Sequence, residues 1–119
     1  VDADQISRVI MSIIGNGVYA VCKKYKQKPY QPTMRLSLST SSDGNNAIIA
    51  IYDNGIGIEK TIIGKVFDPF FTTKTTAEAV GVGLYLSREI ILNHGGDIKI
   101  ESTKEVETTF TITLPIKKS

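Results

Sequence analysis

The feature that most constrains this chain is a run of apolar residues at helical spacing near its start. Small or apolar residues occupy positions 6, 9, 10, 13, 14, 17, 20 and 21, which predicts one long helix over about residues 4–26. Asp2 suits the N-cap of this helix, and Gln5 three residues later completes a capping-box pattern. Gly15 and Gly17 each cost about 1 kcal/mol relative to alanine in a helix interior. We therefore expect another segment to approach this helix closely.

After this helix, the sequence predicts two β-hairpins with two helices between them. The predicted strands lie at residues 34–39, 47–52, 98–100 and 110–114, and they form two hairpins with turns at 43–46 and 104–107. The predicted helices lie at residues 59–66 and 83–93, with a loop over 67–82 between them. This order predicts an α/β fold, a two-layer α/β sandwich whose mixed, mostly antiparallel sheet carries helices on one face. The length fits one domain over residues 1–119, and we expect this domain to be a fragment of a longer chain.

Composition argues against several classes of function. The net charge is only +2 and most basic residues are scattered, so no nucleic-acid partner is expected. The single cysteine, Cys22, excludes an intrachain disulfide and a zinc site built on paired cysteines. No unbroken run of about 18 apolar residues occurs, so no membrane-spanning segment is predicted.

Three polar features interrupt the apolar pattern where a ligand could bind. Asn16 lies at the edge of the apolar stripe, where its amide oxygen suits a hard cation such as Mg²⁺; the alternative is an asparagine that faces solvent. Asp53-Asn54-Gly55-Ile56-Gly57 follows a strand, so its carboxylate could accept a hydrogen bond from an exocyclic amine; a plain turn is the alternative. Gly81-Val82-Gly83-Leu84 opens a helix, where free amide groups suit phosphate, but such a motif alone is not specific.

A fourth stretch, Phe67-Asp68-Pro69-Phe70-Phe71-Thr72-Thr73-Lys74, makes the order and spacing of these motifs specific. Between Asp4 and Pro115 the chain resembles the catalytic ATP-binding domain of sensor histidine kinases. That family lies within the superfamily of gyrase, heat-shock chaperone and mismatch-repair ATPases. The resemblance implies a Bergerat-type ATP-binding fold, with ATP and Mg²⁺ as cofactors.

The resemblance also implies roles for the residues at matching positions. Asn16 resembles the family's Mg²⁺-binding asparagine, and Lys74 borders the nucleotide lid near phosphate; both are expected to be catalytic. Asp53 resembles the aspartate that reads the adenine amino group, and Thr108 resembles a threonine that supports this contact. The other residues expected to bind nucleotide are Gly55, Gly57, Phe67, Phe70, Thr73, Gly81, Val82, Gly83 and Leu84.

Several positions depart from the family pattern. Ser12, one turn before Asn16, stands where hydrolytic relatives have a general-base glutamate, so self-contained ATP hydrolysis is not expected. Gly17 stands where the family usually has alanine, and Val80 stands where it has threonine or serine. Alanine or glutamate replaces a common glycine at Ala77, Ala79 and Glu107. His94 is expected to be structural, because the family's phospho-acceptor histidine lies on a separate helical hairpin.

Two functions remain open. In the first, the domain belongs to a two-component sensor and transfers the ATP γ-phosphate to a histidine on a separate dimerisation domain, so it is inactive alone. Its partners would be the dimerisation and histidine-phosphotransfer domain of the same protein and a downstream response regulator. The fragment itself is expected to be monomeric and cytoplasmic. Its parent protein could be a membrane-bound sensor, in which case the fragment belongs to the cytoplasmic part. The alternative is a degenerate nucleotide-binding or regulatory module with little or no turnover; a serine-directed kinase of the anti-sigma type fits the 67–74 stretch less well.

Overall fold

A computed structural model describes residues 2–25, 33–68 and 81–116 of the chain. In chain order the elements are α1 (Ala3–Tyr25), β1 (Met34–Thr40), β2 (Asn46–Asp53), α2 (Lys60–Ile63), α3 (Gly81–Asn93), β3 (Asp97–Thr103) and β4 (Glu107–Pro115).

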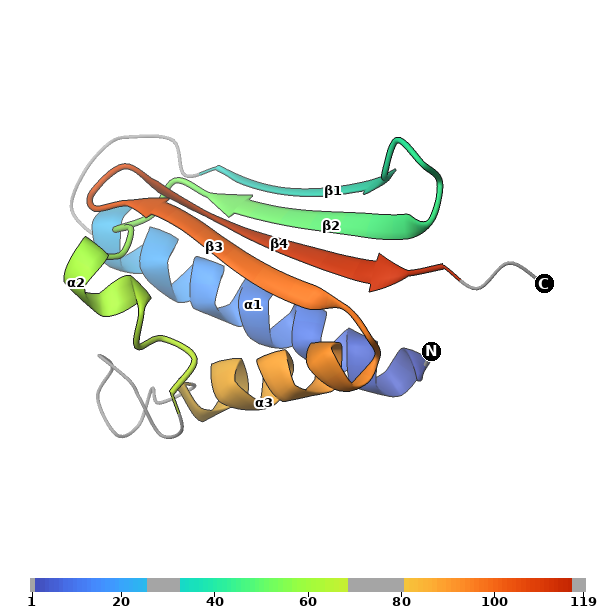
Figure 1. The fold of residues 1–119 in the computed structure, drawn as a ribbon. Coiled ribbons are helices and arrows are strands. Elements are labelled where there is room, and N and C mark those ends of the chain that lie inside the picture. Colours follow the sequence, from blue (N-terminus) through green and yellow to red (C-terminus); the bar gives the residue numbers. More distant parts are fainter. Residues whose placement is uncertain (1, 26–32, 69–80, 117–119) are drawn as a thin grey trace.

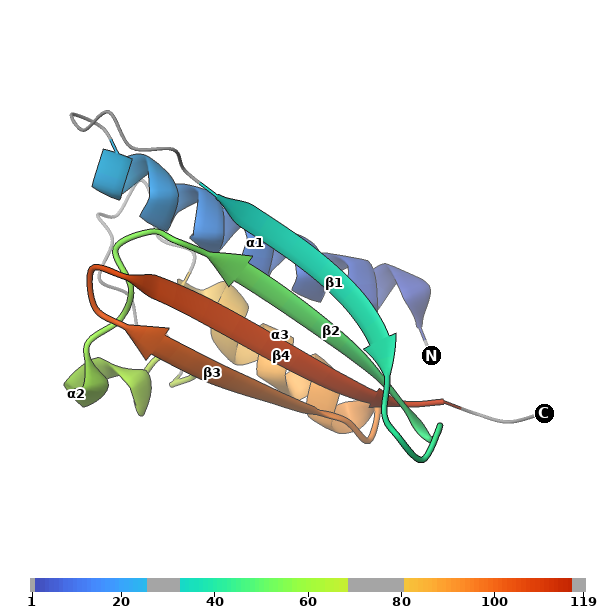
Figure 2. The same ribbon diagram turned by 90° about the horizontal axis from the view of Figure 1, so that it is seen from above.

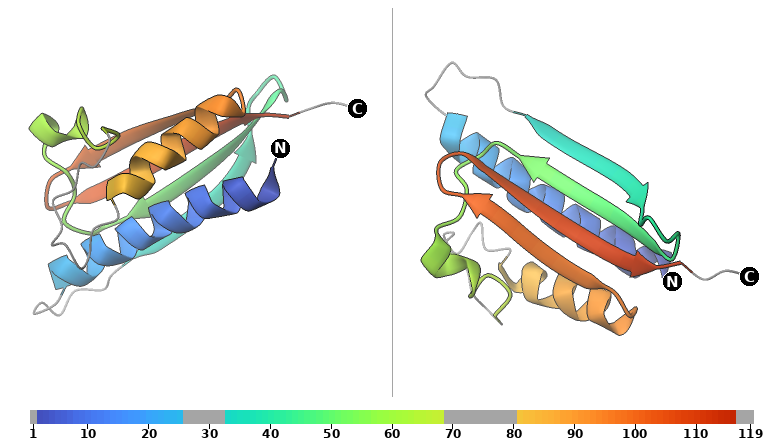
Figure 3. Two further views of the ribbon diagram at one scale, coloured as in Figure 1. Left: turned by 90° about the horizontal axis from the view of Figure 1, so that it is seen from below. Right: turned by 45° about the horizontal axis from the view of Figure 1, so that its top comes forward.

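The strands form one sheet and the two long helices cover one of its faces. The strand order is β1-β2-β4-β3, and every pairing among the described strands is antiparallel. Helices α1 and α3 contact each other and lie beneath the sheet (Figures 1 and 3). The view from above shows the opposite face of the sheet left open (Figure 2). The predicted two-layer α/β sandwich is confirmed, although the described sheet is purely antiparallel and not mixed.

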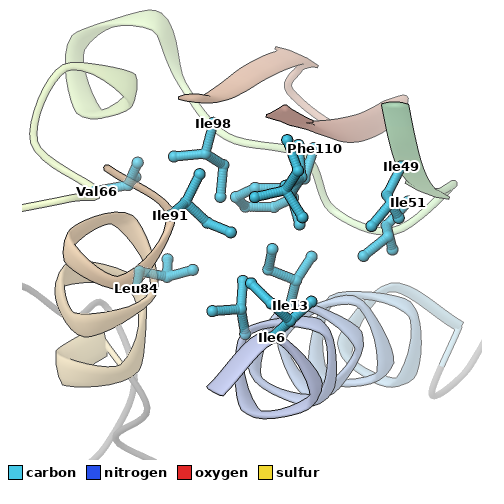
Figure 4. Close-up of a cluster of buried hydrophobic side chains, with 12 residues drawn as sticks. Ile6, Ile13, Ile49, Ile51, Val66, Leu84, Ile91, Ile98 and Phe110 are labelled. Atoms are coloured by element: carbon cyan, nitrogen blue, oxygen red, sulfur yellow. The ribbon is translucent and has the colours of Figure 1, made fainter. Parts of the chain in front are cut away.

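The core fills the space between the helices and the sheet (Figure 4). Alternation along β4 points Phe110, Ile112 and Leu114 inward, where each is at most 6% exposed. The largest fully buried side chains in the described residues come from α1, α3, β2 and β4: Ile13, Ile51, Ile91, Ile112 and Val9. Fully burying a side chain of this kind stabilises the fold by about 1.5–3 kcal/mol. The apolar stripe that predicted α1 is therefore the stripe that builds the core.

The predicted N-cap of α1 is correct. The Asp2 carboxylate accepts hydrogen bonds from the backbone N–H groups of Asp4 and Gln5, at 3.1 and 3.2 Å. The backbone N–H of Asp2 donates to Nε2 of His94 at 3.1 Å. His94 Nδ1 lies 2.7 Å from the carbonyl oxygen of Ile90, so Nδ1 carries the proton and donates it there. The His94 imidazole thus accepts the backbone N–H of Asp2, which the Gln5 side chain would accept in a capping box. This geometry fits the structural role predicted for His94.

The end of α3 is a Schellman motif. The N–H of Gly95 donates to the carbonyl of Leu92, and the N–H of Gly96 donates to that of Ile91, both at 3.0 Å. Gly95 has a φ of 78°, a backbone conformation that residues other than glycine rarely adopt. The sequence His94-Gly95-Gly96 thus ends this helix as predicted.

The two shorter helices differ in extent from the sequence predictions. α2 is shorter than the predicted 59–66: it ends at Ile63, and Gly64 is its C-cap residue. α3 begins at Gly81, two residues earlier than predicted, so Gly81 and Val82 belong to its first turn and not to the loop. Most of the predicted loop, residues 69–80, lies outside the described residues.

Helix α1 is long and apolar enough, by length and composition alone, to cross a membrane. No membrane-spanning segment was predicted from the sequence, because polar residues interrupt the apolar positions of α1. In this fold the apolar residues of α1 have another use, since Ile6, Val9 and Ile13 pack into the core between helix and sheet.

Candidate functional site

A cavity of about 350 Å³ lies at the end of the sandwich where β2 ends and β3 turns into β4. In Figure 1 this is the end to the left, where the last turns of α1, α2 and the start of α3 also meet. The residues that line the cavity are Asn16, Gly17, Tyr19, Ala20, Lys23, Asp53, Ile56, Gly57, Ile58, Glu59, Ile62, Val66, Leu84, Lys104, Glu105, Thr108 and Phe110. Its walls are mostly apolar, and such a cavity with a few placed polar groups is the usual form of a small-molecule site.

Asp53 is the principal polar group in the cavity. It is the last residue of β2, and only 3% of its surface is exposed. Its Oδ1 accepts a hydrogen bond from the N–H of Gly55 at 2.9 Å. Burial raises the pKa of the Asp53 carboxyl, while the Gly55 N–H and the positive charge of Lys24 oppose the rise. A shielded carboxylate in an apolar cavity is well suited to accept a hydrogen bond from an amine of a flat ligand.

Two glycines allow the backbone to approach Asp53 closely. A Cβ on Gly17 would lie 3.4 Å from Asp53 Oδ2 and 2.7 Å from the methyl carbon of Met34. A Cβ on Gly55 would lie 2.6 Å from the backbone carbon of Ala20, so residue 55 must be glycine for this loop to lie against α1. The close approach expected for α1 is thus found at Gly17, whereas Gly15 has no neighbour within 4 Å.

Gly57 is required for a different reason. Its φ is 69°, in the left-handed region, and a Cβ there would lie 2.2 Å from the carbonyl oxygen of Thr103. The neighbouring Ile56 donates its N–H to Ala20 O at 3.3 Å, and its carbonyl accepts the N–H of Glu105 at 2.5 Å. The loop after β2 is therefore clamped between α1 and the β3–β4 turn.

Asn54 and the end of α1 complete this clamp. The Lys24 ammonium donates to the carbonyls of Asn54 and Glu105, at 3.1 and 2.8 Å, and the Tyr25 hydroxyl donates to the Asn54 carbonyl at 3.2 Å. The side-chain oxygen of Asn54 accepts the N–H of Thr33 at 2.7 Å. Asn54 thus has a structural place beside Asp53 and does not line the cavity.

One face of α1 forms a wall of the cavity. Asn16, Tyr19, Ala20 and Lys23 line it together because they are three or four residues apart on the helix. Asn16 is half-buried, and its Nδ2 donates to the carbonyl of Ser12 one turn back, at 3.0 Å. Tyr19, Ala20 and Lys23 were not predicted as site residues. Helical spacing from Asn16 was the signal that could have identified them.

The start of α3 and the segment after α2 form the opposite wall. Leu84 and Val66 line the cavity and are also part of the core. Phe67 does not line it; this ring packs against the core with the Arg88 guanidinium 5.6 Å from its centre. Arg88 thus holds the first aromatic of the 67–74 stretch in place.

Charged residues gather at the cavity rim near the β3–β4 turn. Glu59 and Lys104 form an ion pair there, which lowers the pKa of the Glu59 carboxyl and raises that of the Lys104 ammonium. Both side chains are largely exposed, so this pair adds little stability. Glu59, Lys104 and Glu105 carry no sequence signal for this site, because the contacts that bring them to the rim join residues distant in the sequence.

The structure brings together five of the residues predicted for the site: Asn16, Asp53, Gly57, Leu84 and Thr108 line the cavity. Two others, Gly55 and Phe67, lie behind its lining. Gly81, Val82 and Gly83 form the first turn of α3. The positions of Phe70, Thr73 and Lys74, like those of Phe71, Ala77, Ala79 and Val80, lie outside the described residues.

Comparisons with known proteins agree with this geometry. Residues 1–118 match the family described as histidine kinase-, DNA gyrase B- and HSP90-like ATPases. The chain therefore belongs to this family of ATP-binding domains. The mycobacterial sensor histidine kinase MprB has the same fold, with a TM-score of 0.78 at 23% identity over 97% of this chain and 72% of that one.

The chain is also similar in sequence to part of several sensor proteins and histidine kinases. It is 40% identical over 97% of its length to the signal transduction histidine-protein kinase AtoS of Escherichia coli K12, covering 17% of that protein. It is 37% identical over 99% of its length to the sensor protein RprX of Bacteroides fragilis, covering 22% of it. To the sensor protein TdiS of Thauera aromatica it is 33% identical over 94% of its length, covering 20% of that protein. The chain thus spans about a fifth of the length of each of these relatives.

Proposed function

We propose that this chain is the ATP-binding catalytic domain of a two-component sensor histidine kinase, which transfers the γ-phosphate of ATP to a histidine on a separate dimerisation domain. The observation that supports this most is the buried carboxylate of Asp53 at the end of an apolar cavity of about 350 Å³. Adenine is flat and largely apolar and carries one exocyclic amine, so it matches this cavity. Asp53 accepts from the amine, and Ile56, Ile58 and Phe110 cover the ring.

The phosphates extend from the adenine towards Asn16 and the first turn of α3. The N-terminal N–H groups of a helix are not bonded within the helix, and they suit anionic oxygens. Asn16 supplies an amide oxygen, a ligand type that Mg²⁺ accepts, and the phosphates supply the other oxygens. In the described residues no cluster of three or more His, Cys, Asp or Glu side chains is placed to hold a metal. This fits an ion that arrives with the nucleotide and neutralises phosphate charge when bound.

The chemical step needs a nucleophile from outside this chain. The acceptor imidazole attacks the γ-phosphorus, a P–N bond forms, the bond to the β-phosphate oxygen breaks, and ADP leaves. Catalysis of this kind depends mainly on positioning and charge stabilisation. Position 12 is a serine. Among the described residues, the carboxylates that line the cavity are Asp53, Glu59 and Glu105, around the β2 end and the β3–β4 turn. We therefore expect little hydrolysis of ATP by water.

Partners and location follow from this proposal. The dimerisation domain of the same protein presents the acceptor histidine, and a response regulator then receives the phosphate. Since ATP is the substrate, the domain works in the cytoplasm, and we expect the isolated chain to be monomeric.

A phosphotransfer assay tests the proposal. The domain is mixed with γ-labelled ATP, Mg²⁺ and the separately purified dimerisation hairpin of its parent protein, and a hairpin with glutamine at the acceptor position is the control. We expect acid-labile label on the histidine hairpin alone, and less label with Asn16→Ala than with the neighbouring Gly15→Ala. If ATP binds but no label transfers, the domain is instead a nucleotide-binding module without turnover.

A further inference from the structure

A small hydroxyl network lies directly behind Asp53. Thr108 of β4 is the cross-strand partner of Asp53 on β2, and it is 3% exposed and lines the cavity. Ser102 of β3 is in turn the cross-strand partner of Thr108, and their hydroxyl oxygens are 2.7 Å apart. Ser102 does not line the cavity. Any effect of Ser102 on a ligand must therefore act through a neighbour that does line the cavity, either Thr108 or Ile58.

The hydrogen bonds of Ser102 fix where each proton lies. The Ser102 hydroxyl donates its single proton to the carbonyl of Glu107 at 2.8 Å. Its oxygen accepts the N–H of Ile58 at 2.8 Å. The contact with Thr108 must then use the proton of Thr108, because Ser102 has none left to give.

Thr108 consequently offers only lone pairs to the cavity. Asp53, its neighbour across the strands, is also an acceptor, and its Oδ2 has no hydrogen-bond partner in the described part of the chain. At this end of the cavity, Asp53 and Thr108 therefore present two adjacent acceptors, and the Thr108 hydroxyl has no proton left to donate to a ligand. A primary amine, with two N–H groups on one nitrogen, complements this pair, whereas a carbonyl oxygen would face two acceptors and lose its hydrogen bonds to water.

We propose that Ser102 is a positioning residue that holds the Thr108 hydroxyl as an acceptor and so makes the site selective for 6-aminopurine over 6-oxopurine nucleotides. This inference rests on the proposed function, since it assigns the base selectivity of the same cavity. Ser102 also ties the loop at Ile58 to the sheet, so its structural and selective roles need separate readouts.

The test compares Kd values for ATP and for inosine triphosphate, which has a carbonyl at the 6-position, measured by calorimetry with Mg²⁺. Wild-type protein should prefer ATP. In Ser102→Ala the Thr108 hydroxyl can turn and donate to the carbonyl, so the preference should fall about tenfold. Ser102→Thr keeps the hydroxyl and should restore the preference. Ser37→Ala, an exposed strand serine on β1, should leave it unchanged.

A purely structural role for Ser102 would weaken both nucleotides by the same factor, and an unchanged ratio in a folded Ser102→Ala variant would overturn the inference. If that variant does not fold, N6-methyl-ATP tests the wild-type protein instead. With one N–H fewer it should bind about tenfold more weakly than ATP, and equal binding would contradict the paired acceptors. Failure of wild-type protein to bind any of these nucleotides would instead contradict the proposed function.

Discussion

Asp53→Asn should weaken ATP binding while it stabilises the nucleotide-free domain. Asparagine keeps the oxygen that accepts the Gly55 N–H at 2.9 Å, so the local structure is preserved. The charge on the acceptor is lost, and its new NH₂ group can face the adenine amine. Hydrogen bonds to charged groups contribute about 1.5–3 kcal/mol. At 1.4 kcal/mol for each factor of ten, the Kd for ATP should rise by about 10- to 150-fold.

The stability of the free domain should change in the opposite direction. Burial raises the pKa of Asp53 in the folded state above its value in the unfolded chain. A raised carboxyl pKa favours folding below the unfolded pKa, and that contribution is lost as the pH rises through the folded pKa. Asp53→Asn avoids this loss, so the variant should melt at higher temperature than wild type at neutral pH. The difference should shrink in acid.

Calorimetric ATP titration and thermal unfolding from about pH 4 to pH 8 measure the two effects. Asp43→Asn is the matched control, because Asp43 is exposed and hydrogen bonds from Ser41 and Asn45 lower the pKa of its carboxyl. Stability from a lowered pKa is present above the unfolded pKa, so this variant should lose stability at neutral pH and bind ATP normally. Unchanged ATP affinity in Asp53→Asn would refute the assignment of Asp53 to the adenine amine. A lower melting temperature at neutral pH, with the fold intact, would refute the reasoning from burial.

Three further substitutions test the clamped loop, the interior of α1 and the contact of His94 with the start of α1. Gly57→Ala should destabilise the fold by about 1–3 kcal/mol in urea unfolding, because φ is 69° and a Cβ would meet Thr103 O at 2.2 Å. Gly15→Ala, with no neighbour within 4 Å, should stabilise by about 0.5–1 kcal/mol, and a loss there would contradict the exposed placement of that helix face. His94→Ala should cost about 1–2 kcal/mol through two lost hydrogen bonds and speed amide hydrogen exchange at the start of α1; unchanged exchange would argue against its bond to Asp2.

The fold was largely predictable because its signals are local. Val9 and Ile13 are four residues apart, which is helical spacing, and Phe110, Ile112 and Leu114 alternate as in a strand. Each pattern identifies a buried face without knowledge of the element that packs against it. The Asp2 N-cap and the Gly95-Gly96 ending are likewise short-range chemistry. The sequence did not predict that His94, and not Gln5, accepts the backbone N–H of Asp2, because Asp2 and His94 are 92 positions apart.

The site was predictable only in part. Asn16, Asp53, Gly57 and Thr108 were predicted through a family resemblance, and all four line the cavity. Gly55 was predicted to bind nucleotide; in the structure it allows the loop to pack on α1 and does not line the cavity, so its nucleotide-binding role stays a prediction.

Residues brought to the site by tertiary contacts alone could not be predicted. Ser102 and Lys104 belong to this group, because a strand serine or a turn lysine has no sequence signal until the register of β3 and β4 places it.

The most direct test of the central claim is calorimetric titration of the domain with a non-hydrolysable ATP analogue and with ADP, each with and without Mg²⁺. We predict micromolar binding of both nucleotides that is lost or strongly weakened in Asp53→Asn, and strengthening by Mg²⁺ for the triphosphate that is lost in Asn16→Ala. Equal affinities for the two nucleotides, indifferent to Mg²⁺, would contradict the role of Asn16 and leave only an adenine pocket. No binding of either nucleotide by the folded wild-type domain would contradict the account as a whole.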